Sequence, residues 1–169
     1  DCVDNWHQDI SFDRNEFEDF TVSYNEKSGN DYDRRGYGFV IQARGDHYER
    51  TRLNNFTNIV ASHNSETGVY IQGLDRCDSL PDNLCYTDDV LQNKFHNITS
   101  TFNNQGIYLQ EAIEEGGGIY DSTASNNTES GLYLQGYEGG EIDGGVFSYN
   151  RIGIYVKDDD YLINNVTAS

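Results

Sequence analysis

The feature that most constrains the fold of this chain is an internal repeat. Five short segments each begin with Gly and then alternate apolar with polar residues, and a second short segment that ends in Asn precedes each of them. Alternation with a period of two is typical of half-buried β-strands, and no stretch shows a sustained helical period. Two short strands per repeat predict an all-β chain in which each repeat forms one coil and the coils stack on one another. The Gly-led segments are 38–42, 68–72, 106–110, 131–135 and 153–157, and the Asn-ended segments are 22–25, 61–64, 100–103, 123–126 and 147–150.

The alternation assigns a face to each residue of the Gly-led segments. The first and third residues after Gly are aliphatic or Phe, so we expect them to line the core, with Ile71, Leu109, Leu134 and Ile154 as examples. The second and fourth residues then face outward, and the Asn residues at the turns stack on one another inside their bend. The outward positions hold Tyr70, Tyr108, Tyr133 and Tyr155 in one row and Gln72, Gln110 and Gln135 in the next.

The repeated pattern Asn-x-x-x-Gly-Ile-Tyr-Leu resembles the right-handed parallel β-helix repeat of the pectin-lyase-like superfamily. The resemblance covers residues 17–169 and leaves residues 1–16 as an N-terminal segment of one domain, 1–169. It implies a right-handed parallel β-helix, a solenoid of about five coils. It does not select a function, because this fold serves lyases, hydrolases, epimerases, tailspikes and inert scaffolds.

The outward tyrosine and glutamine rows form a candidate ladder for glycan binding or assembly. Stacked aromatic rings at coil spacing suit sugar rings or another subunit. The alternative is that the rings simply cover the sheet and stabilise neighbouring coils. The sequence leaves both interpretations open.

Two further clusters are weaker candidates. Arg44, His47, Tyr48 and Arg50 lie in the most basic stretch of an acidic chain, where they would dock a polyuronate and move a proton, or else form ion pairs with adjacent carboxylates. Asp158, Asp159 and Asp160 offer hard oxygen ligands for Ca²⁺, or else form a solvated acidic rim. No catalytic residue of the family can be carried over, since the Asp-Pro-His motif of alginate epimerases does not occur. No cofactor is expected beyond that weak Ca²⁺ candidate.

Several features favour an extracellular or cell-surface location. The sequence contains no Met, which fits removal of a leader from a secreted protein or a fragment of a longer one. Cys77 and Cys85 lie close together in a polar segment and predict a local disulfide, and Cys2 is left to pair between chains. Four sequons for N-glycosylation support secretion mildly, at Asn55, Asn97, Asn126 and Asn165.

The charge balance narrows the range of partners. With 11 basic and 29 acidic residues the net charge is −18, which repels nucleic acid and anionic membrane surfaces. No apolar run reaches the roughly 20 residues of a membrane-spanning helix. An acidic protein of this kind is expected neither to bind nucleic acid nor to insert into a membrane.

The end of the sequence suggests self-association. Residues 165–169 match the strand that precedes the turn Asn in earlier repeats. Either the chain is a piece of a longer solenoid, or the open edge pairs with the first turns of another copy, near Trp6 to Phe20, and forms a filament. The function expected first is therefore that of a non-catalytic structural subunit, as a head-to-tail filament or a glycan-facing surface scaffold. The alternative is a carbohydrate-active enzyme, a lyase or epimerase acting on a charged polysaccharide.

Overall fold

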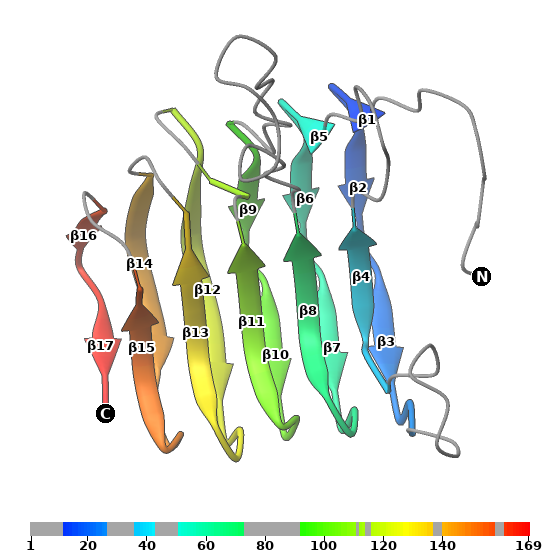
Figure 1. Ribbon diagram of the computed structural model, residues 1–169, viewed down its shortest axis with the longest axis vertical. Coiled ribbons are helices and arrows are strands. Elements are labelled where there is room, and N and C mark those ends of the chain that lie inside the picture. Colours follow the sequence, from blue (N-terminus) through cyan, green and yellow to red (C-terminus); the bar gives the residue numbers. More distant parts are fainter. Residues whose placement is uncertain are drawn as a thin grey trace, which may run out of the picture.

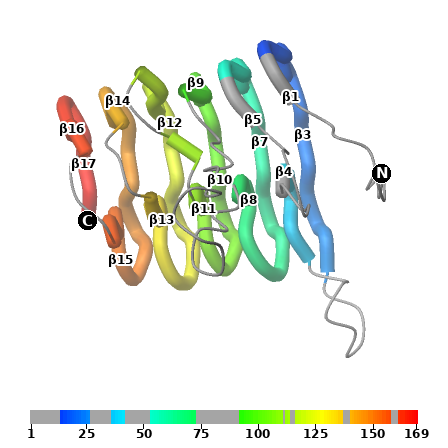
Figure 2. Tube along the Cα trace, turned by 45° about the horizontal axis from the view of Figure 1, so that its top comes forward, coloured from blue at the N-terminus to red at the C-terminus, as the bar shows by residue number. Residues whose placement is uncertain are grey.

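The computed structural model describes residues 12–26, 36–42, 51–72, 92–110, 112–113, 116–136, 140–157 and 161–169. Within them every element of regular secondary structure is a β-strand, and every strand pair is parallel. This part of the chain includes no helix that could span a membrane. The predicted all-β class is confirmed, and the curled parallel sheets are compatible with a β-solenoid (Figures 1 and 2).

The Gly-led segments form one five-stranded parallel sheet in the order β15-β13-β11-β8-β4. Equivalent residues pair in register, so that Ile71 lies beside Leu109 and Leu109 beside Leu134. The strands are β4 (Phe39–Gln42), β8 (Thr67–Gln72), β11 (Gln105–Gln110), β13 (Ser130–Gln135) and β15 (Ile152–Val156).

The second sheet has ten strands in two rows. Its long strand β12 (Gly118–Ser125) pairs with β9 through Gly118–Tyr120 and with β10 through Thr123–Ser125, and β14 (Glu141–Phe147) likewise pairs with both β16 and β17. The first row otherwise holds β2 (Glu16–Glu18), β6 (Asn55–Thr57), β9 (Lys94–His96) and β16 (Leu162–Asn164). The second row otherwise holds β3 (Thr21–Ser23), β7 (Val60–Ser62), β10 (Thr99–Thr101) and β17 (Thr167–Ala168).

The first row corrects the prediction of two strands per repeat. The first three repeats contain a third strand ahead of the two expected ones, as β6 precedes β7 and β8, and in the next two repeats it is continuous with the second-row strand as β12 and β14. The first-row strands β2, β6 and β9 have three residues each, and three residues are too few to show a recognisable alternation of apolar and polar residues. A further short pair, β1 (Phe12–Asp13) with β5 (Thr51–Arg52), lies just ahead of this row in the chain.

Left-handed backbone residues end the strands at each corner. Among the described residues thirteen non-glycine residues have positive φ, and in the first three repeats they recur at three places. Asp and Asn, which tolerate this conformation, fill the corner between the two rows, for example Asp19, Asn58 and Asn97. Bulkier residues fill most positions of the other two corners, where the conformation costs more, for example Leu53 ahead of the first row and Phe102 after the second.

The core lies between the three strand rows and consists of side-chain ladders. Phe56 and Phe95 are fully buried, and their stacked rings have centroids 4.7 Å apart. On the five-stranded sheet Ile71, Leu109 and Leu134 are fully buried, which confirms the predicted alternation. Ile154, predicted with them, is only partly buried.

A ladder of buried asparagine amides follows the corner after the second row. The Nδ2 of Asn64 donates to Oδ1 of Asn103 at 2.9 Å, and that of Asn103 donates to Oδ1 of Asn127 at 3.3 Å. The predicted stacking of turn Asn residues is thus confirmed, with one correction: Asn127, not Asn126, occupies the fourth position. The complete ladder is Asn25, Asn64, Asn103, Asn127 and Asn150.

A second ladder, ahead of the first row, was not predicted. The Nδ2 of Asn15 donates to Asn54, the Nδ2 of Asn54 donates to Asn93, and the Nδ2 of Asn93 donates to the carbonyl oxygen of Ala112.

The repeated glycine makes room for the first asparagine ladder. A Cβ atom on Gly68 would lie 2.6 Å from Nδ2 of Asn103, and one on Gly106 would lie 2.8 Å from Nδ2 of Asn127. Neither amide could stay in the ladder beside such an atom. The Asn and the Gly of the repeat are therefore two parts of one packing requirement.

Candidate functional site

Most of the charged candidate residues lie outside the described part of the chain. This applies to the basic cluster, the predicted disulfide, the remaining cysteine and the acidic triplet, which are Arg44, His47, Tyr48, Arg50, Cys77, Cys85, Cys2, Asp158, Asp159 and Asp160. These predictions stay predictions. The outward ladders and the four sequons are all described.

A row of five stacked tyrosine rings crosses the outer face of the five-stranded sheet. Neighbouring centroids are 4.5–5.1 Å apart and the rings are inclined by 4–23°. The rings belong to Tyr37, Tyr70, Tyr108, Tyr133 and Tyr155, of which the last four were predicted on this face. Tyr37 was missed because it lies ahead of β4, and the residue paired with Tyr70 in the sheet is Val40.

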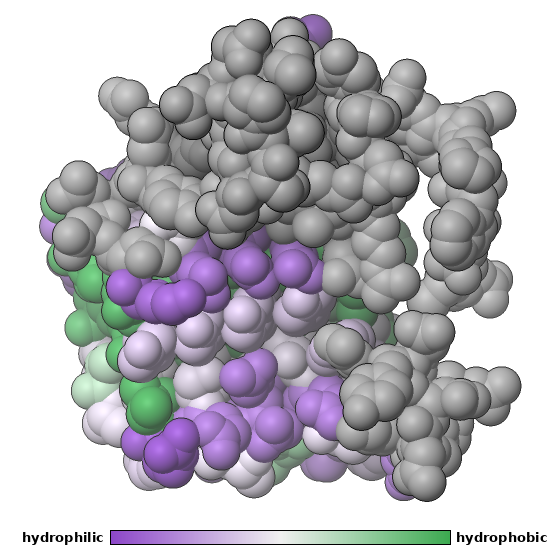
Figure 3. Space-filling view, in the orientation of Figure 1, coloured by the Kyte–Doolittle hydropathy of each residue, from purple (hydrophilic) through white to green (hydrophobic). Residues whose placement is uncertain are grey.

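The stacking determines which ligand contacts the tyrosine row can offer. The inner rings cover one another's faces, so they present ring edges and hydroxyl groups to solvent rather than the faces on which a sugar stacks. The glutamine row runs beside them, with Gln72, Gln110 and Gln135 paired in register. The hydroxyl of Tyr70 donates to Oε1 of Gln72 at 2.6 Å. The surface is a strip of edges, hydroxyls and amides, and polar residues cover the same face in Figure 3.

A second polar strip lies on the outer face of the first row. The rings of His96 and Tyr120 are stacked with centroids 4.7 Å apart, and the Tyr120 hydroxyl donates to Oε2 of Glu141 at 3.3 Å. Partial burial lowers the pKa of His96, nearby Lys94 lowers it further, and Asp121 opposes both. Partial burial and the Glu141 carboxylate raise the pKa of Tyr120. Both effects favour the neutral imidazole and the neutral phenol.

A row of exposed aromatic residues follows the corner after the second strand row. This corner row consists of Tyr24, His63, Phe102, Asn126 and Tyr149, all with positive φ. The rings of Tyr24, His63 and Phe102 stack with centroids 4.8 and 4.9 Å apart. The row was not predicted, because the alternation assigns the residue before each turn Asn to the preceding strand segment, whereas its left-handed conformation makes it part of the corner. Only the recurrence of an aromatic ring just before that Asn could have revealed it.

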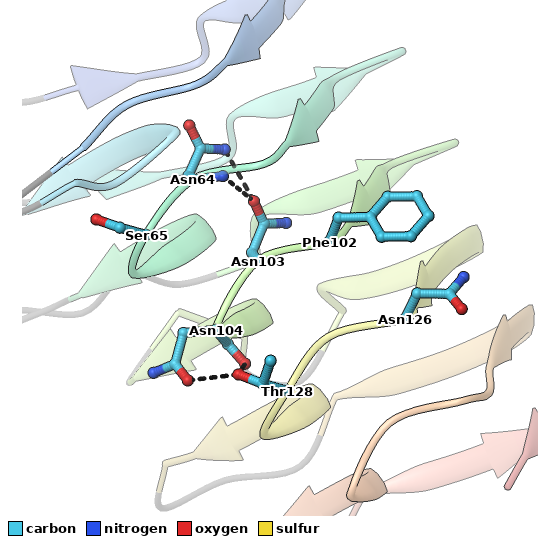
Figure 4. Close-up of a pocket in the computed structure, with 7 residues that line it drawn as sticks. All are labelled: Asn64, Ser65, Phe102, Asn103, Asn104, Asn126 and Thr128. Carbon is cyan, nitrogen blue, oxygen red and sulfur yellow. Dashed lines mark hydrogen bonds between the residues drawn. The ribbon is translucent and has the colours of Figure 1, made fainter.

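A shallow hollow of about 370 Å³ opens on this corner. Phe102 and Asn126 project to the same side of it, and Asn104 and Thr128 lie across from them (Figure 4). The Thr128 hydroxyl donates to Oδ1 of Asn104 at 2.7 Å. One aromatic ring beside several amides and hydroxyls is a chemistry suited to sugars.

The four sequon asparagines differ in their hydrogen bonds. Nδ2 of Asn97 donates to Asn58 at 2.8 Å and Nδ2 of Asn165 donates to Asp143 at 2.8 Å. Oδ1 of Asn55 accepts a long bond of 3.5 Å from Thr57. Asn126 is exposed, and its side chain makes no hydrogen bond within the described residues.

The described residues include no cluster of three or more His, Cys, Asp or Glu side chains that could hold a metal ion. Comparisons of the chain with protein-family models, curated proteins and solved structures find no match.

Proposed function

We propose that this chain is an extracellular, non-catalytic structural unit, built as a right-handed parallel β-helix of about five coils, that assembles end to end or serves as a surface scaffold. One observation carries the proposal: its aromatic and amide side chains are arranged in rows along the stack of strands. Each row member contacts its equivalent in the next repeat, as Tyr108 contacts Tyr133 and Asn64 contacts Asn103. Such ladders stiffen a solenoid and continue naturally into a further repeat.

The edge formed by β15, β16 and β17 supports end-to-end contact. Within the described residues, these strands pair on one side only. Leu162 is 57% exposed and Ile163 is 45% exposed, and hydrophobic surface gathers at this edge in Figure 3. A second copy that added strands here would pair the free backbone groups and cover these side chains.

The test is negative-stain imaging of the purified chain, with Ile163→Asp as the variant. We expect elongated assemblies for the unmodified chain and single particles for Ile163→Asp, because a carboxylate at the edge would be buried unpaired. Val60→Asp is the matched control, since Val60 is exposed on β7, which has a strand on each side. Equal assembly by Ile163→Asp would overturn the end-to-end contact.

A separate assay tests the non-catalytic part of the proposal. Alginate and pectin are incubated with the chain, and the unsaturated product of a lyase reaction is followed by absorbance. We expect no product. Formation of product would establish the carbohydrate-active enzyme instead.

A further inference from the structure

The corner row is interrupted at one position. Its rings stack from Tyr24 through His63 to Phe102, and the next member is Asn126, a residue with no ring. The backbone nitrogen of Asn126 donates to the carbonyl oxygen of Ser148, as that of His63 donates to Thr101, so Tyr149 follows Asn126 as Phe102 follows His63. Asn126 thus lies between two exposed rings, Phe102 at 55% and Tyr149 at 79%.

The spacing of the repeats gives this interruption a definite width. Adjacent parallel strands lie about 4.8 Å apart, so rings two repeats apart are separated by roughly 9.6 Å. Carbon atoms in contact lie about 3.5–4.0 Å apart, so a flat ring held between two others needs roughly 7–8 Å. The interruption at Asn126 is therefore wide enough for one sugar ring to lie against Phe102, which lines the hollow together with Asn126.

Asn126 is also the sequon asparagine best placed to carry a sugar. Modification at Nδ2 of Asn97 or Asn165 would disturb a corner hydrogen bond to Asn58 or Asp143. Asn55 makes no such donation, but it lies on a flat strand between Glu16 and Lys94, away from the hollow. Asn126 and Thr128, the first and third residues of their sequon, both line the hollow.

We propose that Asn126 carries an N-linked glycan whose first sugar lies in this hollow against the ring of Phe102. Nδ2 of Asn126 forms a bond to the anomeric carbon of an oligosaccharide held on a lipid diphosphate, the donor of a cellular glycosyltransferase. The bond from that carbon to the diphosphate oxygen breaks, its electron pair leaves with the lipid diphosphate, and one amide proton passes to solvent. The proposal rests on the extracellular location proposed above. It adds which asparagine carries the glycan and where the first sugar lies on the protein surface.

The experiment uses the full chain, secreted from a eukaryotic cell behind a cleavable leader. Glycopeptide mass spectrometry should find a glycan at Asn126, and Asn126→Gln should remove that glycan mass, whereas Asn97→Gln should change the intact mass only by the added methylene group and leave the glycan mass unchanged. An unmodified Asn126 in folded, secreted protein would overturn the proposal. Light scattering of the Asn126→Gln chain tests assembly independently, so the glycan can fail while the structural function stands.

A second measurement tests whether the first sugar lies in the hollow against Phe102. Peptide N-glycosidase acts on the folded glycoprotein, and the rate of glycan release from Asn126 is followed by intact mass. Phe102→Ala should speed release about two- to tenfold, the effect of losing one aromatic contact. Tyr24→Ala is the matched control, because Tyr24 is 72% exposed in the same row but lies away from the hollow.

Equal release rates for the Phe102 and Tyr24 variants would overturn the proposed contact between the first sugar and the ring of Phe102. If Phe102→Ala does not fold, Phe102→Leu keeps an apolar side chain without a ring face, and the same comparison decides the question.

Discussion

At the scale of single residues, the buried asparagines are satisfied by repetition. A primary amide donates and accepts, so a column of identical amides meets most of its hydrogen-bonding capacity without any other partner. Asn103 shows the full pattern: it accepts from the backbone and side-chain nitrogens of Asn64 and donates to Ala61, Ser100 and Asn127. Removing one member leaves its neighbours without hydrogen-bond partners, and buried polar groups without partners lower the free energy of unfolding.

Asn103→Ala should therefore lower the free energy of unfolding by about 2–4 kcal/mol, since it leaves the backbone and side-chain donors of Asn64 unpaired and removes the side-chain donor to Asn127, whose Oδ1 keeps only the backbone N–H of residue 103. Urea unfolding followed by circular dichroism measures the change. Asn104→Ala is the matched control, because Asn104 is the adjacent, partly exposed asparagine. The control should cost about 1 kcal/mol or less. Equal losses in the two variants would show that the ladder does not stabilise the fold.

At the scale of the strand, left-handed residues mark the corners of the repeats, at all three corners in the first three repeats. A left-handed residue turns the chain sharply, and the next strand then begins on a new face. Leu53, with φ of 57°, performs this role ahead of β6 although a branched side chain disfavours the conformation. Leu53 is 39% exposed, so the packing of its side chain offsets little of the free-energy cost of this conformation.

Leu53→Asn should raise the free energy of unfolding by about 0.5–1 kcal/mol, because Asn adopts positive φ more readily than Leu. The midpoint of urea unfolding reports the change. Val60→Asn provides the control: Val60 is 36% exposed in the strand β7, where Asn is disfavoured, and this variant should lose stability. A loss of stability in Leu53→Asn as well would mean that the leucine contributes more by packing than it costs by strain.

The strands that are long enough to show a period could be predicted from the sequence. The five-stranded sheet and its outward tyrosines follow from four to six alternating residues per strand. The first row could not be found because a strand such as β6 offers one apolar residue between two polar ones. Asn126 and Asn127 are consecutive amides, and only the three-dimensional register shows which one is buried. The corner row depends on backbone conformation, which alternation does not report.

At the scale of the whole molecule, the ladders and the net charge act in opposite directions on assembly. Ladders favour addition of a further repeat at the edge of β15, β16 and β17, whereas two chains of charge −18 repel each other. The ladder contacts act over a few ångströms and the repulsion acts over the Debye length. That length falls from about 10 Å at 0.1 M salt to about 3 Å at 1 M. Salt therefore weakens the opposing effect and leaves the apolar contact in place.

The proposed end-to-end assembly should accordingly strengthen as NaCl rises, and the mean mass measured by light scattering should increase from that of one 19.2 kDa chain. Lys157→Glu makes the charge of each chain more negative by two beside β15, so its assembly should require more salt. Lys94→Glu makes the same change in charge on β9, away from that edge, and should shift the midpoint less. If the mass stays at one chain across the whole salt range, end-to-end assembly is excluded and the surface scaffold is the form that stands. If both lysine variants shift the midpoint equally, only the overall charge matters, and the contact does not lie at the edge of β15.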